Sequence, residues 1–389
     1  MLATQLSLNA VTVTRTFDGI ESAAHRALAL LGGMDAILSG AKIAILKPNF
    51  VAGRPAETGS TTSFALLKAV AEEVRAAGAE PVLCEIPGTE FDRESTYTIL
   101  GVEQFCAEHG IRIARIDPEG GEEDWIELRP AGAKRLRRFH IPRFMQDACF
   151  INLPVLKTHV VSTMTLALKN PMGILPRPDR RAMHTLGIAQ CIVDMNRGIK
   201  PDLTIVDGSV GQDGEGPLYG EPANLNVLVA GRDSLAVDVA CCQLVGVQPR
   251  AVPHLKLALE QLGKPAFTLQ SEVAGALKQF RLPRQKPLYH FIFWLMYPLD
   301  YPYSWLAERG KHFCTTLYGT GMVGTRPHID EAQCTRCGLC VEACPLPQVI
   351  DLKTLRVNPK TCQRCLLCYD ACPEHAIRVK GYSGARGPA

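Results

Sequence analysis

Eight of the fifteen cysteines in the chain follow one spacing pattern that occurs twice near the C-terminus. Each copy reads C-x₂-C-x₂-C-x₃-C and is followed directly by a proline, Pro345 or Pro373. Three thiolates separated by two residues can surround one face of a cubic [4Fe–4S] cluster in a tight loop, and the fourth thiolate must come from elsewhere. The candidate ligands are Cys334, Cys337, Cys340, Cys344, Cys362, Cys365, Cys368 and Cys372.

The doubled run is the ligand pattern of two-cluster bacterial ferredoxins, in which the fourth cysteine of each run binds the other cluster. We therefore predict two [4Fe–4S] clusters and a protein through which electrons pass. The first ligand set is Cys334, Cys337, Cys340 and Cys372. The second ligand set is Cys362, Cys365, Cys368 and Cys344.

Two other uses of cysteine compete with this interpretation. Zinc sites use C-x₂-C pairs, but usually two pairs held well apart. A disulfide framework is typical of small secreted chains, whereas this chain has 389 residues and its first residues lack the pattern of an export signal. The repetition of the run with its prolines favours iron–sulfur clusters. The other seven cysteines have no paired spacing and are predicted to be buried as small apolar groups.

Composition limits the class of partner. A formal net charge of +3 is too small to indicate nucleic-acid binding. The sequence contains no run of eighteen apolar residues, so we expect no transmembrane segment. With reduced cysteines and no export signal expected, we predict a cytoplasmic location.

The region from about 40 to 280 alternates between strand and helix patterns. The apolar run 43–47 indicates a buried strand, residues 64–74 have helical spacing, and residues 81–86 indicate the next strand. Such a βαβ unit implies a parallel sheet. Further strands are expected at 149–153, 203–206 and 226–230, and a helix at 234–244. The predicted fold is therefore α/β, with a large, mostly parallel-sheet domain over residues 1–283 and a small α+β two-cluster ferredoxin domain over 328–380.

Residues 284–327 stand apart because their first half is rich in aromatic side chains and contains Pro298 and Pro302, which interrupt any long helix. We interpret this segment as a buried linker that packs the ferredoxin domain against the large domain. An exposed segment that docks to a partner protein or a membrane surface is the alternative. Residues 381–389 are expected to form a disordered tail.

Polar residues recur where strands end, which is where parallel sheets place their ligands. Lys47 and Asn49 follow the first strand, and Thr61 and Thr62 precede the helix. Hydroxyl groups at a helix start are usually caps, although the free backbone N–H groups there can also bind an anion.

A second polar group follows the 149–153 strand and contains Lys157, His159, Lys169 and Asn170. Its lysines lie in an apolar stretch, and lysine is seldom buried without a partner. The pattern favours a role in lining a pocket, and a structural ion pair is the alternative.

A third group follows the 203–206 strand in a glycine-rich segment that we expect to be a loop, and it includes Asp213 and Glu215. Its glycines match neither the dinucleotide nor the P-loop fingerprint. Carboxylates there suit a cation, an amine or acid–base chemistry, while an ordinary glycine-rich turn is the alternative.

At these residues the chain resembles the family known as domain of unknown function 362. The resemblance covers about 40–265 and 328–380. It implies the α/β fold, a C-terminal two-cluster ferredoxin and a redox association, but no settled substrate. The segments that carry the resemblance include KPN (47–49), INLPVLKTH (151–159), LALKNPMG (166–173) and GEGP (214–217).

The leading hypothesis is an iron–sulfur oxidoreductase whose clusters relay electrons from a redox partner protein to a substrate or cofactor in the large domain. Lysines would bind an anionic group of a small-molecule substrate, a histidine would donate a proton and a carboxylate would position the substrate. The candidate catalytic residues are Lys157, His159, Lys169 and Glu215. The candidate substrate-binding residues are Lys47, Asn49, Thr61, Thr62, Asn170, His184 and Asp213.

Two hypotheses of other classes remain. The protein could be a non-catalytic electron-transfer partner that docks to another redox enzyme, or a binding protein whose clusters are structural or redox-sensing. No flavin or nicotinamide fingerprint is visible, but flavin sites often lack one.

Overall fold

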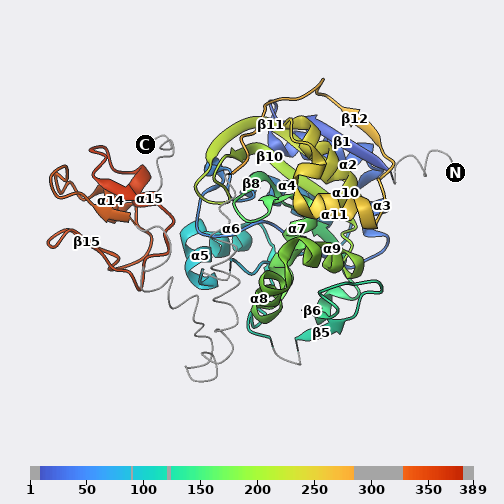
Figure 1. The fold of residues 1–389 in the computed structure, drawn as a ribbon, viewed down its shortest axis with the longest axis horizontal. Helices are drawn as coiled ribbons and strands as arrows, with labels where there is room; N and C mark the ends of the chain where they lie inside the picture. The colour runs from blue at the N-terminus through green and yellow to red at the C-terminus, as the bar shows by residue number, and fades with distance from the viewer. Residues whose placement is uncertain (1–8, 89–90, 121–123, 284–326, 380–389) are drawn as a thin grey trace.

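A computed structural model describes residues 9–88, 91–120, 124–283 and 327–379. These residues form a large α/β domain and a small C-terminal domain that lies beside it (Figure 1). The predicted linker, apart from Pro327, and the predicted tail lie outside the described residues.

The large domain is built around a mixed sheet that has ten strands among the described residues. The five strands from β10 to β4 are parallel, and β11 runs antiparallel between β10 and β1. This arrangement confirms the predicted α/β class with a mostly parallel sheet. In spatial order the strands are β12 (Thr268–Ser271), β1 (Ala10–Arg15), β11 (Glu221–Gly231), β10 (Leu203–Asp213), β7 (Cys149–Asn152), β2 (Ile43–Lys47), β3 (Glu80–Leu83) and β4 (Arg112–Ile113).

Two short strands extend this sheet beside β10. The strand β8 (Val155–His159) runs parallel to β10, and β9 (Thr163–Met164) pairs antiparallel with β8. The polar group that begins at Lys157 therefore starts on a strand and not in a loop.

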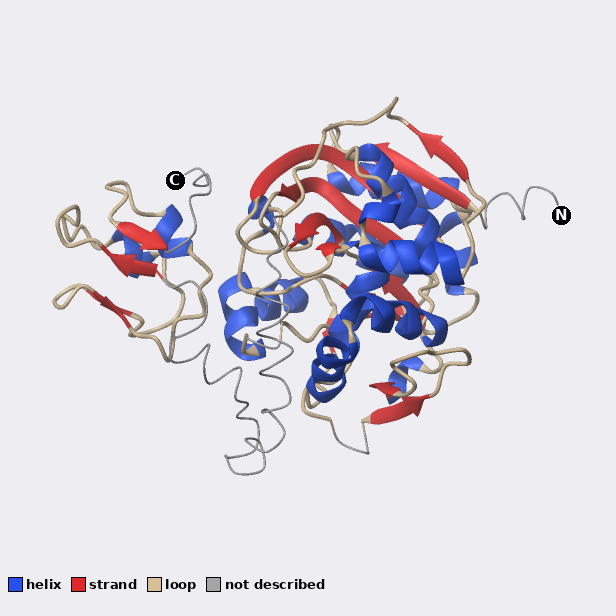
Figure 2. Cartoon of the chain, in the orientation of Figure 1, coloured by secondary structure: helices blue, strands red, loops and turns tan. Residues whose placement is uncertain are grey.

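Helices cover both faces of the sheet (Figure 2). Successive side chains of a strand point to opposite faces of the sheet. In β2, Ile45 therefore belongs to one apolar core while Ala44 and Leu46 belong to the other, and helices must cover both faces. One core contains α2 (Ile20–Leu30) and α4 (Phe64–Ala76). The opposite core contains α7 (Leu166–Lys169), α9 (Ile188–Gly198), α10 (Ser234–Leu244) and α11 (Pro253–Gln261).

The remaining elements of the large domain connect or flank these layers. A short antiparallel pair, β5 and β6, lies outside the main sheet. These elements are α3 (Gly33–Leu38), α5 (Arg93–Leu100), α6 (Val102–Glu108), α8 (Arg177–Leu186), β5 (Trp125–Leu128) and β6 (Phe139–Pro142).

The segment after residue 206 differs from the sequence prediction. It was expected to be a loop, but β10 continues to Asp213 because β11 pairs with it antiparallel as far as Glu221. The glycines permit a close approach of neighbouring backbone. A Cβ atom on Gly211 would lie 2.6 Å from the Leu156 carbonyl oxygen.

The small domain contains two antiparallel strand pairs and two short helices. Val349, Ile350, Ile377 and Val379, which belong to apolar segments after the two cysteine runs, are buried in its core. Tyr219 of the large domain packs against this core. Its elements are β13 (Pro327–Ile329), α14 (Leu339–Glu342), β14 (Ile350–Asp351), β15 (Arg356–Val357), α15 (Leu367–Asp370) and β16 (Ile377–Val379).

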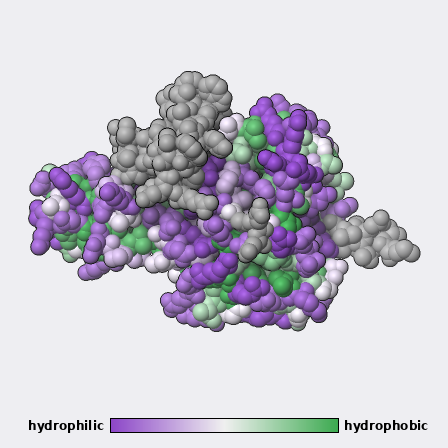
Figure 3. Space-filling model, turned by 90° about the horizontal axis from the view of Figure 1, so that it is seen from below, coloured by the Kyte–Doolittle hydropathy of each residue, from purple (hydrophilic) through white to green (hydrophobic). Residues whose placement is uncertain are grey.

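Six of the seven remaining cysteines are buried, which confirms their prediction as apolar packing groups, and Cys314 lies outside the described residues. No helix in the described ranges combines the length and the apolar character needed to cross a membrane. The surface seen in Figure 3 is mostly hydrophilic, with apolar patches between the polar groups.

The loop that follows β2 depends on the absence of a side chain at Gly59. Its φ angle is +69°, and an added Cβ atom would lie 2.0 Å from the Gly211 carbonyl oxygen. Gly78 has a similar φ of +80° but open space around it. We expect Gly59→Ala to lower the free energy of unfolding by more than about 2 kcal/mol, and Gly78→Ala by about 1 kcal/mol. Chemical denaturation followed by circular dichroism tests this, and equal costs would contradict the steric argument.

Candidate functional site

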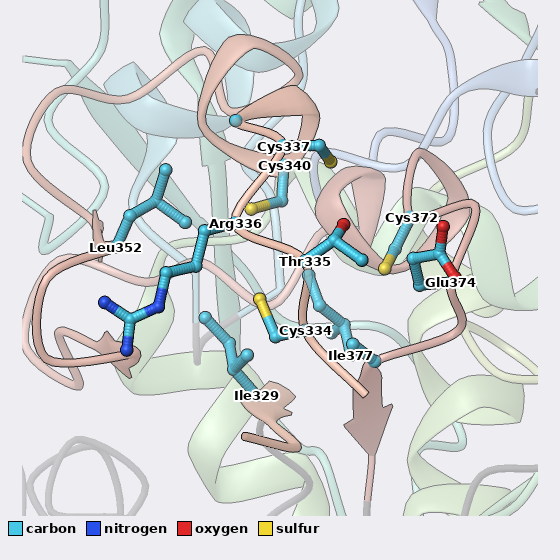
Figure 4. Close-up of a pocket in the computed structure, with 12 residues that line it drawn as sticks. Ile329, Cys334, Thr335, Arg336, Cys337, Cys340, Leu352, Cys372, Glu374 and Ile377 are labelled. Atoms are coloured by element: carbon cyan, nitrogen blue, oxygen red, sulfur yellow. The ribbon is translucent and has the colours of Figure 1, made fainter. Parts of the chain in front are cut away.

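The small domain brings four cysteines around one cavity, with sulfur atoms visible in Figure 4. Three come from the first run and the fourth comes from the second run, as the ferredoxin pattern predicts. Apolar side chains, among them Ile329 and Ile377, line the same cavity. The four cysteines are Cys334, Cys337, Cys340 and Cys372.

The other four cysteines form a second group. Burial raises the pKa of Cys365 to about 11, and the nearby thiols of Cys362 and Cys344 add to the rise. Burial also raises the pKa of Cys368, and the same neighbours contribute. Cys344 of the first run therefore lies with the cysteines of the second run. This position supports the prediction that the fourth cysteine of each run binds the other cluster.

The two groups fit iron–sulfur clusters better than single metal ions. In the part of the chain that the structure describes, no three Cys, His, Asp or Glu side chains converge on the position of one ion. A cubic cluster separates its four thiolates more widely, and bound iron would keep them deprotonated. The assignment of individual ligands stays a prediction that this arrangement supports.

A buried polar network lies in the large domain, where β2, β3 and β7 end. The Lys47 ammonium forms an ion pair with Glu85 and lies 3.3 Å from Asn170 Oδ1. Asn170 donates through Nδ2 to Asn152 Oδ1 at 2.8 Å and accepts from Asn49 Nδ2 at 2.7 Å. These contacts join the strand ends to the η3 turn (Asn170–Ile174).

The Lys47–Glu85 pair is almost completely buried. Burial lowers the pKa of Lys47 and raises that of Glu85, and the attraction between the two charges opposes both shifts. Gly173 makes room for the pair, because a Cβ atom there would lie 2.7 Å from Glu85 Oε2. Because Glu85 already balances the charge of Lys47, Lys47 is less suited to bind an anion than the sequence suggested.

Lys157 differs from Lys47 in its partners. It is fully buried on β8, and its ammonium donates to Asn49 Oδ1 at 2.7 Å and to the Ser60 carbonyl oxygen. Both acceptors are neutral, and no carboxylate lies within ion-pair distance among the described residues. Burial holds the pKa of Lys157 well below its usual value, and repulsion from Lys169 and Lys47 outweighs attraction to Glu85.

His159 ends the same strand. Its Nδ1 accepts a hydrogen bond from the Val161 backbone N–H at 3.0 Å, which leaves the proton of the neutral ring on Nε2. Burial lowers the pKa of His159 strongly, and nearby cationic or basic side chains lower it further. These neighbours are Lys169, Lys157, His184 and His254.

The structure thus brings together most of the basic residues that the sequence indicated. Lys169 ends α7, and His184 lies on α8. His254 on α11 was missed, since a single histidine in an amphipathic segment carries no sequence signal. Both ring nitrogens of His254 are buried without a hydrogen bond to any described residue, and burial lowers its pKa to about 3.

The hydroxyl groups before α4 have different roles. Ser63 caps the helix by accepting from the Leu66 N–H, so neither Thr61 nor Thr62 is the cap. Thr62 Oγ1 accepts from the Asn49 N–H at 2.8 Å and donates to the Leu153 carbonyl at 2.7 Å. Thr61 Oγ1 is buried and has no hydrogen-bond partner in the described part of the chain.

The carboxylates at the end of β10 and just after it have other surroundings. Asp213 forms ion pairs with Arg281 at 3.0 Å and Lys278 at 3.3 Å, and Glu215 is exposed. Their predicted roles toward a substrate gain no support from these contacts. The adjacent glycine-rich segment packs on β8, where the Val160 N–H donates to the Gly216 carbonyl at 2.9 Å. A Cβ atom on Gly216 would lie 2.2 Å from the Thr158 carbonyl oxygen.

An α/β domain with a buried group of basic side chains and a ferredoxin-type domain together define an iron–sulfur electron-transfer protein. Comparison with known families agrees, because residues 326–373 match the model described as 4Fe-4S dicluster domain. Residues 44–243 match the model described as domain of unknown function (DUF362). The chain belongs to this family. It is also similar to "Thylakoid-associated protein sll1697" of Synechocystis sp., with 26% identity over 248 residues that cover 60% of this chain and 72% of the relative.

The buried ion pair at the strand ends leads to a stability prediction. Glu85→Gln leaves the Lys47 ammonium without its counter-charge, and we expect a loss of about 3–5 kcal/mol in the free energy of unfolding. The double variant Lys47→Met/Glu85→Gln removes both charges and should recover much of that loss. Anaerobic urea denaturation measures both. A double variant that is less stable than the single one would contradict the pair as the cause.

The buried His254 makes stability depend on pH. Its pKa is 6.5 when unfolded and about 3 when folded, so between these values the unfolded chain binds the extra proton. Protonation of this residue does not reduce the free energy of unfolding above pH 6.5. Below pH 6.5 the free energy of unfolding falls by up to about 1.4 kcal/mol for each pH unit. His254→Phe should flatten the profile of melting temperature between pH 7.5 and 5.5. The same substitution at the exposed His328 is the control, and an unchanged slope in His254→Phe would refute the assignment.

Proposed function

We propose that the protein is an iron–sulfur oxidoreductase that transfers electrons from two [4Fe–4S] clusters to an anionic small molecule in the large domain. The observation that carries the proposal is the Lys157 ammonium, which is fully buried, bonded to neutral oxygens and placed near further basic groups. Lys157, Lys169 and His159 would hold the anion.

The electrostatics of this basic group support an anionic ligand. A buried ammonium without a counter-charge is costly, and the pKa of Lys157 is lowered accordingly. A carboxylate or phosphate group bound there would reverse the shift, because an opposite charge stabilises the protonated amine. Asn49 and Ser60 would keep the ammonium oriented toward such a group.

The same residues suit proton-coupled electron transfer. The clusters supply single electrons, and a reduced substrate commonly takes up protons as well. His159 presents Nε2–H as a hydrogen-bond donor while its ring is neutral. An anion beside the ring would raise its pKa, so that His159 could carry a proton and release it to the substrate.

The proposal includes a redox partner protein, because the clusters must be reduced from outside the chain. We keep the cytoplasm as the proposed location. The name of the Synechocystis relative associates that protein with thylakoids.

A non-catalytic electron carrier is the second candidate function. The exposed loop around Arg336 and Cys337 favours it, since a partner could dock on this side of the small domain. Electron transfer to a metabolite in the absence of a second enzyme distinguishes the two candidates.

The test uses anaerobic protein reduced by dithionite, with the excess removed, and a panel of phosphorylated and carboxylated metabolites. Reoxidation is followed in the visible absorption of the clusters. Lys157→Met should slow metabolite-dependent reoxidation about 10- to 100-fold, because one charge-assisted contact is lost. The visible spectrum should remain unchanged.

Lys200→Met is the matched control, since Lys200 is exposed, and it should retain the wild-type rate. A Lys157→Met protein that reoxidises at the wild-type rate with the same metabolite would exclude Lys157 as a substrate ligand. Absence of reoxidation by any metabolite in the wild type would favour the electron carrier.

A further inference from the structure

The two cysteine loops have the same spacing but different exposure. Thr335, Arg336 and Cys337 of the first loop are exposed. The corresponding residues of the second loop, Gln363, Arg364 and Cys365, are half-buried. The difference shows that one cluster site faces outward while the other is covered.

Residues of the large domain contact the second loop. Arg54 reaches across the interface, where its Nη1 donates to the Cys365 carbonyl at 2.9 Å and lies 3.8 Å from Asp370 Oδ2. The Asp92 N–H also donates to Gln363 Oε1 at 3.4 Å. The Arg54 side chain is only 4% exposed, so its charge is poorly screened by water.

Arg54 belongs to the same loop that accepts hydrogen bonds from Lys157. The segment 49–60 begins with Asn49, includes Arg54 and ends with Ser60. Asn49 and Ser60 accept hydrogen bonds from Lys157, while Arg54 contacts a predicted cluster-ligand residue. One continuous segment therefore connects the second cluster site with Lys157.

We propose that the cluster held by Cys344, Cys362, Cys365 and Cys368 is the proximal cluster, which delivers electrons to the large domain, and that Arg54 positions it and tunes its potential. The other cluster, on the exposed side, accepts electrons from the partner protein. The destination of the electrons rests on the proposed function, whereas the order of the clusters rests on the interface alone.

Charge explains how Arg54 would act. Reduction adds one negative charge to the cluster that accepts the electron, and a nearby guanidinium stabilises that charge. The distal cluster is oxidised by one electron as the proximal cluster is reduced by one. A buried arginine on the proximal side raises its potential and so favours transfer toward the large domain.

The experiment is a redox titration of the full-length protein with both clusters, monitored by electron paramagnetic resonance. Cys337→Ser and Cys365→Ser each alter the signal of one cluster and thereby assign the two signals. Arg54→Gln should shift the potential of the Cys365 cluster to more negative values and leave that of the Cys337 cluster in place. Arg54→Lys, which retains the charge, should produce a smaller shift.

Two further variants make the result specific. Asp370→Asn removes a negative charge beside Arg54 and should shift the same potential in the opposite direction, even if Arg54→Gln loses its cluster. Arg336→Gln, at the exposed loop, should leave the Cys365 cluster unchanged. Equal shifts of both clusters, or no shift in either Arg54→Gln or Asp370→Asn, would overturn the proposal. Because no substrate is used, failure of the proposed oxidoreductase function would not affect this outcome.

Discussion

The structure depends on how two buried lysines are accommodated at the carboxyl ends of a parallel sheet. Lys47 is compensated by Glu85, and the amides of Asn49 and Asn170 distribute hydrogen bonds between the neighbouring strand ends. The oxygen atoms to which the Lys157 ammonium donates hydrogen bonds are neutral. We propose that this contrast separates a lysine that stabilises the fold from a lysine that binds a ligand.

The loop between β2 and α4 connects these charges with the ferredoxin-type domain. Its beginning and end contact Lys157, its middle contributes Arg54 to the interface, and Gly59 allows it to approach β10. The strand β10, the buried Lys157 and a predicted cluster site are thus in contact with one segment. This continuity is the physical basis for treating the protein as one electron-transfer unit.

The sequence predicted much of the fold because hydrophobic periodicity is local. The strand at 43–47 and the helix at 234–244 have the predicted bounds. The extension of β10 to Asp213 was missed, since a glycine-rich segment becomes a strand only when β11 supplies its hydrogen bonds. Lys157, His159 and Lys169 were identified as pocket candidates, but Asp213 was assigned to the substrate although Arg281 and Lys278 neutralise it.

The sequence by itself determined that this is an iron–sulfur protein, because the order and spacing of the cysteines specify cluster ligands. It also indicated which polar residues follow the strands. Only the tertiary structure decided which lysine is paired, which cluster loop is covered and where Arg54 and His254 lie. Partners of these side chains come from distant parts of the chain, and the burial that changes their charge exists only after the sheet, helices and small domain have packed together.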